Sequence, residues 1–333
     1  MPAPKKIVSS ILRVVFSIAL LFLLFKTRNI NLKELAADIR HADKALLLLS
    51  FGVFFLINIF GLLRWEMLLR AAKLFIPLKR IIISYSGGIF FSLILPSTIG
   101  GDLTRSIDLS LHTKKPHEVV ATVLLDRLSG YAGLVILVLA SVFFGWGYVR
   151  ENKFIFVSVI IITLLLAAVL LVLFNRPAYR KIKSVLQSPG AGKIREALRE
   201  LHHEIHIFRD RKKVLLQNLL LSVLIQGMGP LTLYLICLSL GQKVNFIYFL
   251  IFIPIIGAIT LIPISIGGLG VRENLTVYLF SYAGLSENVA AGMALLNFSF
   301  ILLCGIIGGL IYVFTVRHRR VQHYQPPAFP PRS

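Results

Sequence analysis

The chain has 333 residues, of which 56% are hydrophobic and only 15% are charged, and its formal net charge is +21 at pH 7. Apolar runs of about 18 or more residues with few charges are typical of transmembrane helices, so this composition excludes an ordinary soluble domain. The basic residues lie in the connections beside the apolar runs, where they set topology and meet anionic lipid, which argues against nucleic acid as a partner.

Six apolar stretches are long enough to span a membrane, and they cover residues 7–25, 45–63, 119–144, 154–174, 214–240 and 290–316. The first could pass for a signal peptide. However, no small-residue cleavage site follows it and more spans come after it, so we interpret it as a retained first helix. The sequence therefore predicts a polytopic membrane protein, located in the cytoplasmic (inner) membrane of a bacterial or archaeal cell.

Basic connections orient these spans. The segment after residue 63 contains Arg64, Arg70 and Lys73, and residues 175–213 form the most basic loop of the chain. Because cytoplasmic loops are enriched in Lys and Arg, both segments are predicted to be cytoplasmic, as are both termini. Within the long loop, an amphipathic helix is predicted over residues 194–208 on the inner leaflet. Residues 1–316 then form a single transmembrane domain, followed by a disordered, proline-rich cytoplasmic tail over residues 317–333.

Two similar breaks interrupt the apolar pattern. Residues 95–105 read LPSTIGGDLTR and residues 263–272 read PISIGGLGVR. Arg105 and Arg272 are separated by the same 167 positions as Gly100 and Gly267. Freed backbone groups and charges are costly in hydrocarbon, so each break must be lined by protein. A break repeated in two halves of a membrane chain indicates a transporter-like site near the midplane.

Each break is followed by a helix too short to span, over residues 103–111 and 274–282. Both flanks of the first break are basic, which predicts a re-entrant hairpin over residues 81–111. The alternative, one irregular span, would reverse every later helix and is disfavoured by the basic loop at 175–213. The predicted fold class is an all-α polytopic membrane protein with six transmembrane helices and two re-entrant broken-helix hairpins. They form an inverted repeat with halves at about 45–145 and 214–316.

The start of each short helix is a candidate anion site, because its N–H groups and positive dipole end are unpaired. Arginines in the first turn can bind a phosphate with two hydrogen bonds. The candidate substrate-binding residues are Gly100, Gly101, Asp102, Arg105, Asp126, Arg127, Gly267, Gly268, Arg272 and Glu273. We expect Arg105 and Arg272 to face one cavity.

Structural interpretations of these residues stay open. Arg105 can pair with Asp102 or Asp108, and Arg272 with Glu273, as plain bridges. Asp126 can neutralise Arg105, carry a proton in coupled transport or form a structural ion pair. Weaker candidates, which helix-to-helix hydrogen bonds explain equally well, are Arg64, Glu66, Asn58, Gln226, Asn274 and Asn297.

No metal site or cofactor is predicted. His202 and His206 have the spacing of a metal pair, but no carboxylate or thiol partner completes a site, so a polar helix face at the headgroups is favoured. Cys237 and Cys304 both lie in apolar runs, which argues against a disulfide framework.

Three segments resemble the lysylphosphatidylglycerol synthase transmembrane family: PSTIGGDLTR, VLLDRLSG at 123–130 and IPISIGGLGVRE at 262–273. This flippase-like region is also found at the N-terminal side of MprF-type proteins, and the resemblance covers about residues 7–316. It implies translocation of a lipid between leaflets. The soluble aminoacyl-transfer domain of the full-length pattern is missing, since residues 175–213 are too few to fold into one.

The leading hypothesis is therefore a non-enzymatic translocator of an anionic or lipid-linked substrate, with a phospholipid or a polyprenyl-phosphate-linked lipid as its partner. No P-loop is present, so an ion gradient would drive it or it would act as a facilitator. The alternatives are an integral membrane glycosyl or lipid transferase and an accessory subunit for a separate lipid-modifying enzyme. No DxD or DDxxD motif supports the transferase. A homo-oligomer is left open.

Overall fold

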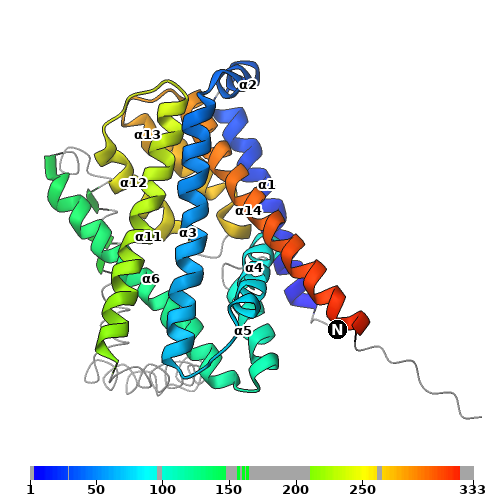
Figure 1. Cartoon of the computed structure of the whole chain (residues 1–333). Coiled ribbons are helices and arrows are strands. Elements are labelled where there is room, and N and C mark those ends of the chain that lie inside the picture. The colour runs from blue at the N-terminus through cyan, green and yellow to red at the C-terminus, as the bar shows by residue number, and fades with distance from the viewer. Residues whose placement is uncertain are drawn as a thin grey trace, which may run out of the picture.

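A computed structural model describes residues 4–28, 30–95, 100–147, 156–157, 160–161, 163–164, 211–260 and 265–322. All secondary-structure elements in these parts of the chain are helices, joined by turns, which confirms the predicted all-α class (Figure 1). Most of the predicted span at 154–174, the predicted amphipathic helix at 194–208 with His202 and His206, and the end of the tail at 323–333 lie outside the described residues.

The described helices follow the predicted stretches closely. They are α1 (Pro4–Thr27), α2 (Leu32–His41), α3 (Lys44–Ala71), α4 (Leu78–Ile94), α5 (Gly100–Thr113), α6 (Pro116–Phe144), α11 (Lys212–Ser239), α12 (Phe246–Thr260), the 3-10 turn η2 (Ile266–Gly268), α13 (Val271–Ser281) and α14 (Glu287–Gln322). Among the described residues, α3, α6, α11 and α14 are each long and apolar enough to cross a membrane, and α1 with α2 forms a bent pair that would make a fifth span.

Two helices end well beyond their predicted bounds. α3 continues to Ala71, eight residues past the end predicted at Leu63, and it buries Trp65 and Leu69 in doing so. α14 continues to Gln322, past the end predicted at residue 316. The start of α3 is set by Asp43, whose Oδ1 accepts hydrogen bonds from the N–H groups of Ala45 (2.8 Å) and Leu46 (3.1 Å), as an N-cap residue does.

The helices fall into two series with the same order. Adding 167 to the bounds of α3 gives residues 211–238, and α11 covers residues 212–239. The same shift relates the starts of α4 and α12, of α5 and α13, and of α6 and α14 to within a few residues. The packing partners correspond as well: α4 packs on α14 as α12 packs on α6, and α3 packs against α11. In Figure 1, α12 and α13 lie toward the end that carries α2, whereas α4 and α5 lie toward the opposite end.

Aromatic packing holds the second pair of short helices together. The ring centroid of Phe280 on α13 lies 4.7 Å from the ring centroid of Phe249 and 5.2 Å from that of Phe252, and both of these residues are on α12. All three side chains are fully buried. Since such ring pairs are stabilising beyond the area that they bury, they keep α13 folded back against α12.

Small residues set the distance between α4 and α14. A Cβ built on Gly308 of α14 would lie 2.7 Å from the main-chain oxygen of Ser86 on α4, closer than real Cβ atoms come to such an atom. Between helices in a membrane, glycines allow this close backbone approach, which replaces the hydrophobic driving force that lipid does not provide.

We predict that Gly308→Ala destabilises the protein by about 1–3 kcal/mol, because the clash is with backbone and only a shift of a whole helix can relieve it. Gly52→Ala on α3 is the matched control: a Cβ there meets nothing within 4 Å, so its stability should be unchanged or slightly higher. Thermal unfolding in detergent micelles measures both. Equal melting temperatures for the two variants would contradict the close α4–α14 contact.

Candidate functional site

The first break brings the start of α5 against α4. A Cβ on Gly88 of α4 would lie 3.1 Å from the main-chain oxygen of Gly101 on α5 and 3.5 Å from the Cβ and Cδ of Arg105. The two helices therefore touch through glycines at the tip of the pair. This contact places Asp102 and Arg105, in the first two turns of α5, beside α6.

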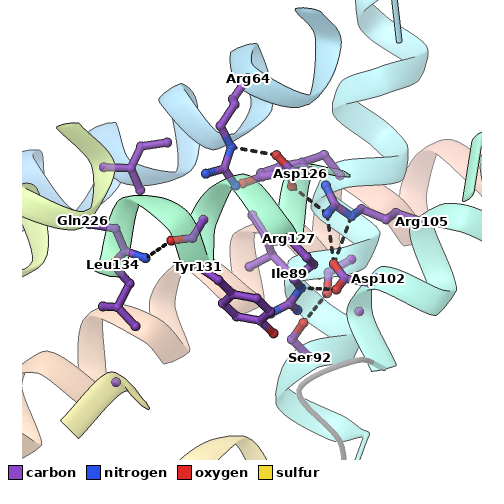
Figure 2. Close-up of a pocket in the computed structure, with 16 residues that line it drawn as sticks. Arg64, Ile89, Ser92, Asp102, Arg105, Asp126, Arg127, Tyr131, Leu134 and Gln226 are labelled. Atoms are coloured by element: carbon purple, nitrogen blue, oxygen red, sulfur yellow. Dashed lines mark hydrogen bonds and ion pairs between the residues drawn. The ribbon is translucent and has the colours of Figure 1, made fainter. Parts of the chain in front are cut away.

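Asp126 on α6 lies between two arginines (Figure 2). Its Oδ1 accepts a hydrogen bond from Nε of Arg64 on α3 at 2.7 Å, and its Oδ2 accepts one from Nη2 of Arg105 at 2.8 Å. Asp126 and Arg105 are each 4% exposed. A buried carboxylate is tolerated when cations and hydrogen bonds compensate for its lost hydration, and both are present here.

Asp102 repeats this arrangement one step further along. Its Oδ1 accepts a hydrogen bond from Nε of Arg105 at 3.1 Å, and its Oδ2 pairs with Nε of Arg127 on α6. The five side chains thus alternate in sign, in the order Arg64, Asp126, Arg105, Asp102, Arg127, and we call them the ionic chain. Three cations and two anions leave one positive charge.

Arg105 occupies the middle of the ionic chain and also stacks on aromatic rings. Its guanidinium carbon lies 4.7 Å from the ring centre of Trp65 and 5.7 Å from that of Tyr85. Its Nη1 is buried and has no hydrogen-bond partner among the described residues. The rings compensate in part for this, because a cation is attracted to the face of an aromatic ring.

The ionic chain lines a cavity of about 350 Å³, which we call the first cavity. All five of its members are on the wall, together with polar groups from α4, α6 and α11, namely Tyr85, Ser92, Tyr131 and Gln226. Asp126 and Arg127 are adjacent in the sequence, yet both face this cavity (Figure 2). Its wall therefore combines polar groups and charges of both signs with apolar side chains such as Ile89 and Leu134.

The second break has a different local structure. Gly267, Gly268 and Gly270 all have positive φ, of 56°, 79° and 82°, a region that residues with a side chain rarely adopt. Glu273 then stabilises the first turn of α13: its Oε2 accepts the N–H of Gly270 at 2.6 Å, and its Oε1 pairs with Nη2 of Arg272 at 2.7 Å. Glu273 is fully buried, so it caps the helix and holds Arg272 in place.

Next to the first cavity lies another, of about 410 Å³, which we call the second cavity. Ile89, Ser92 and Arg127 are on the walls of both, and Gly267 and Arg272 come from the second break. A Cβ on Gly267 would lie 3.7 Å from the main-chain oxygen of Ser92. The tips of the two broken pairs therefore meet, and Arg127 stands between the cavities.

The predicted site residues divide between these two places. Gly101, Asp102, Arg105, Asp126 and Arg127 line the first cavity, and Gly267 and Arg272 line the second together with Arg127, whereas Gly100, Gly268 and Glu273 line neither. The expectation that Arg105 and Arg272 share one cavity is corrected: Arg105 lines the first cavity and Arg272 lines the second. The reason is that the tips of the two broken helix pairs pack side by side. The expected Arg105–Asp102 and Arg272–Glu273 bridges form, while Asp108 pairs with Arg80 at 2.7 Å.

Some of the residues that line the first cavity have little or no signal in the sequence. Arg64 is a weaker candidate from the sequence, because hydrogen bonds between helices explain it equally well. Tyr85, Ser92 and Tyr131 lie in apolar stretches with no repeated motif, and only the fold reveals them. In the part of the chain that the structure describes, no group of three His, Cys, Asp or Glu side chains is arranged to hold a metal ion.

Comparison with known proteins agrees with the resemblance. Residues 10–309 match the family described as the lysylphosphatidylglycerol synthase TM region. The chain belongs to this family. Similar proteins include a UPF0104 membrane protein of Pyrococcus horikoshii, 25% identical over 313 residues (88% of this chain and 92% of the relative). Another is a UPF0104 membrane protein of Methanothermobacter thermautotrophicus, 25% identical over 282 residues (78% and 81%). Together with its apolar helices, this makes the chain a multi-pass integral membrane protein.

The ionic chain makes a stability prediction. Asp126→Asn leaves Arg64 and Arg105 facing each other without the carboxylate between them, so we expect a loss of about 3–5 kcal/mol. The matched control is Glu287→Gln, which breaks the more exposed Arg28–Glu287 pair (2.8 Å) and should cost less than about 1 kcal/mol. Unfolding in detergent compares the two. Similar losses for both variants would show that the ionic chain does not hold the fold together.

Proposed function

We propose that this protein translocates an anionic or lipid-linked substrate across the cytoplasmic membrane, with the headgroup held where the two Gly-Gly/Arg tips meet. The observation that carries the proposal is this convergence: two helix breaks, 167 residues apart, contribute arginines to adjacent cavities that share Arg127. Transporter folds with repeated, broken helices place their substrate sites at such points.

The charge balance supports an anionic substrate. Among the described residues, the ion pairs of Arg64, Arg105, Arg127 and Arg272 involve three carboxylates, those of Asp102, Asp126 and Glu273. Charged side chains at membrane depth are costly and are usually functional. One remaining positive charge beside two cavities therefore suits the phosphate of a lipid headgroup, which would otherwise have no partner on its way through the hydrocarbon.

We propose translocation rather than catalysis by this chain. Asp102 and Asp126 are each held between two arginines, so their oxygens are occupied by guanidinium groups. A metal-dependent lipid transferase needs carboxylate oxygens directed at a shared divalent cation. The transferase and the accessory subunit of a lipid-modifying enzyme are the alternatives that the experiments below distinguish.

The proposal includes a topology with six spans, both termini in the cytoplasm, and two re-entrant pairs that enter from opposite sides. We predict that a thiol-reactive, membrane-impermeant probe labels Lys114→Cys, after α5, only from the cytoplasmic side. It should label Ser286→Cys, after α13, only from outside. Both positions are exposed, and the native Cys237 and Cys304 are buried. Labelling of both from the same side would rule out the inverted arrangement.

Translocation itself is tested by leaflet exchange of fluorescent phosphatidylglycerol and of polyprenyl phosphate in proteoliposomes. Arg272→Gln should slow exchange by about 10- to 100-fold, the equivalent of losing a charged hydrogen bond to the headgroup. Arg105→Gln should slow exchange as well, because it removes the middle of the ionic chain on the wall of the first cavity. Arg80→Gln is the control, since this buried arginine pairs with Asp108 but lines neither cavity. It should keep its exchange rate even if its melting temperature falls.

Two results would overturn the proposal. If no lipid is exchanged by the wild type while one of them is chemically converted, the protein is a transferase. If exchange occurs only when a separate lipid-modifying enzyme is added, the accessory role is correct.

A further inference from the structure

The second cavity combines apolar walls with positive charge. Leu93, Leu269, Phe298, Ile301 and Leu302 form most of its surface. Leu302 is 38% exposed on the outer side of α14, among other exposed apolar residues of a helix long enough to span a membrane. A hydrocarbon chain can therefore lie against this wall while a headgroup lies deeper inside.

Both charged residues on this wall are arginines. Arg127 and Arg272 line the second cavity, and no acidic side chain is among its described lining residues. Their carboxylate partners are placed elsewhere: Asp102 lines the first cavity and Glu273 is fully buried behind the turn. The two arginines thus present their charge to the second cavity. Asp102 holds Arg127 in place and Glu273 holds Arg272 in place, and neither carboxylate is on the wall of this cavity.

These two arginines are also the accessible ones. The side chains of Arg127 and Arg272 are 32% and 18% exposed, whereas that of Arg105 is 5% exposed. Guanidinium groups bind phosphate oxygens through paired hydrogen bonds. An incoming phosphate can reach Arg127 and Arg272 without breaking the buried part of the ionic chain.

The repeat shows which residue keeps this cavity positive. Asp102 lies three positions before Arg105, and the matching position before Arg272 is Leu269. In the first half a carboxylate at that position pairs with two arginines, whereas in the second half a leucine adds no negative charge to the wall. The wall of the first cavity therefore has charges of both signs, whereas the charged residues among those described on the wall of the second are all positive.

We propose that the second cavity is a headgroup site for a lipid bearing a phosphate and a net negative charge, and that it rejects the aminoacylated form of the same lipid. Lysyl-phosphatidylglycerol carries two ammonium groups beside its phosphate, so its headgroup is net positive. It would face two arginines on a wall with no carboxylate among its described residues. The inference rests on the proposed function for its place in the translocation path, but binding can be measured without transport.

The test is equilibrium binding to the purified full chain in a neutral detergent, read by native mass spectrometry. The probes are dioctanoyl phosphatidylglycerol and its lysyl ester, which share glycerol and acyl chains. The wild type should bind the unmodified lipid at least about tenfold more tightly, since one unfavourable charge pair near a protein surface is worth more than that factor. Inorganic phosphate should compete at least about 100-fold more weakly, because it cannot use the apolar wall.

A matched pair of variants locates the site. Leu269→Asp gives the second break the carboxylate that the first has, and should weaken binding of dioctanoyl phosphatidylglycerol by at least about tenfold and remove or reverse the preference over the lysyl ester. Leu269→Asn has nearly the same shape without the charge, and should keep the preference. Neither variant removes an ion pair, so both should fold.

Each other outcome overturns a defined part of the proposal. If the Leu269→Asp and Leu269→Asn variants behave alike, the lipid binds elsewhere. If the wild type binds the lysyl ester more tightly, the proposed selectivity is reversed. If inorganic phosphate competes as well as the lipid does, this is a site for free phosphate. Selective binding without leaflet exchange would leave the site standing and refute translocation. Leaflet exchange without selective binding would refute the headgroup site and leave translocation standing.

Discussion

The arginine that the first half of the molecule depends on is Arg105, because its guanidinium is shared between Asp126 and Asp102. Through these two carboxylates it is linked to Arg64 on α3 and Arg127 on α6, and Arg64 reaches α11 by donating a hydrogen bond to Ser222 at 2.9 Å. Each buried ion would cost several kcal/mol alone. The break lets a short helix start at Gly100, and this helix places Arg105 between Asp102 and Asp126.

The second half has the same helices without the same charges. The positions that match Arg64, Asp102, Asp126 and Arg127 at the offset of 167 are Leu231, Leu269, Met293 and Ala294. Arg272 alone matches its counterpart, and it is held by the neighbouring Glu273 rather than by distant helices. Apolar packing replaces the ionic chain here, with Phe280 between Phe249 and Phe252. The repeat therefore preserves the backbone arrangement, while the two halves stabilise it by different interactions.

Local patterns explain which features were predictable. Apolar length located α3, α6, α11 and α14, and the proline and glycine pairs located the breaks, since both signals act within a few residues. The Asp102–Arg105 and Arg272–Glu273 pairs are equally local. Arg64 and Asp126, in contrast, are 62 positions apart, and their pairing depends on α3 running past Leu63. That Arg105 and Arg272 face separate cavities depends on how the two tips pack, which no spacing within either motif encodes.

The difference between the halves has an energetic consequence for any movement of the short helices. Displacing α5 would separate Arg105 from Asp126 and Asp102 from Arg127, because Asp126 and Arg127 are both on α6. It would leave uncompensated charge in a buried place, which is among the costliest changes a fold can undergo. Displacing α13 would break none of the ion pairs between the described residues, because Glu273 and Arg272 are on the same helix and move together. Its aromatic contacts can be exchanged for contacts with lipid, which is about as apolar as the helices themselves. One side of the second cavity is therefore formed by Arg127, which belongs to the ionic chain. The other side is formed next to α13, which can shift while Arg272 stays paired with Glu273.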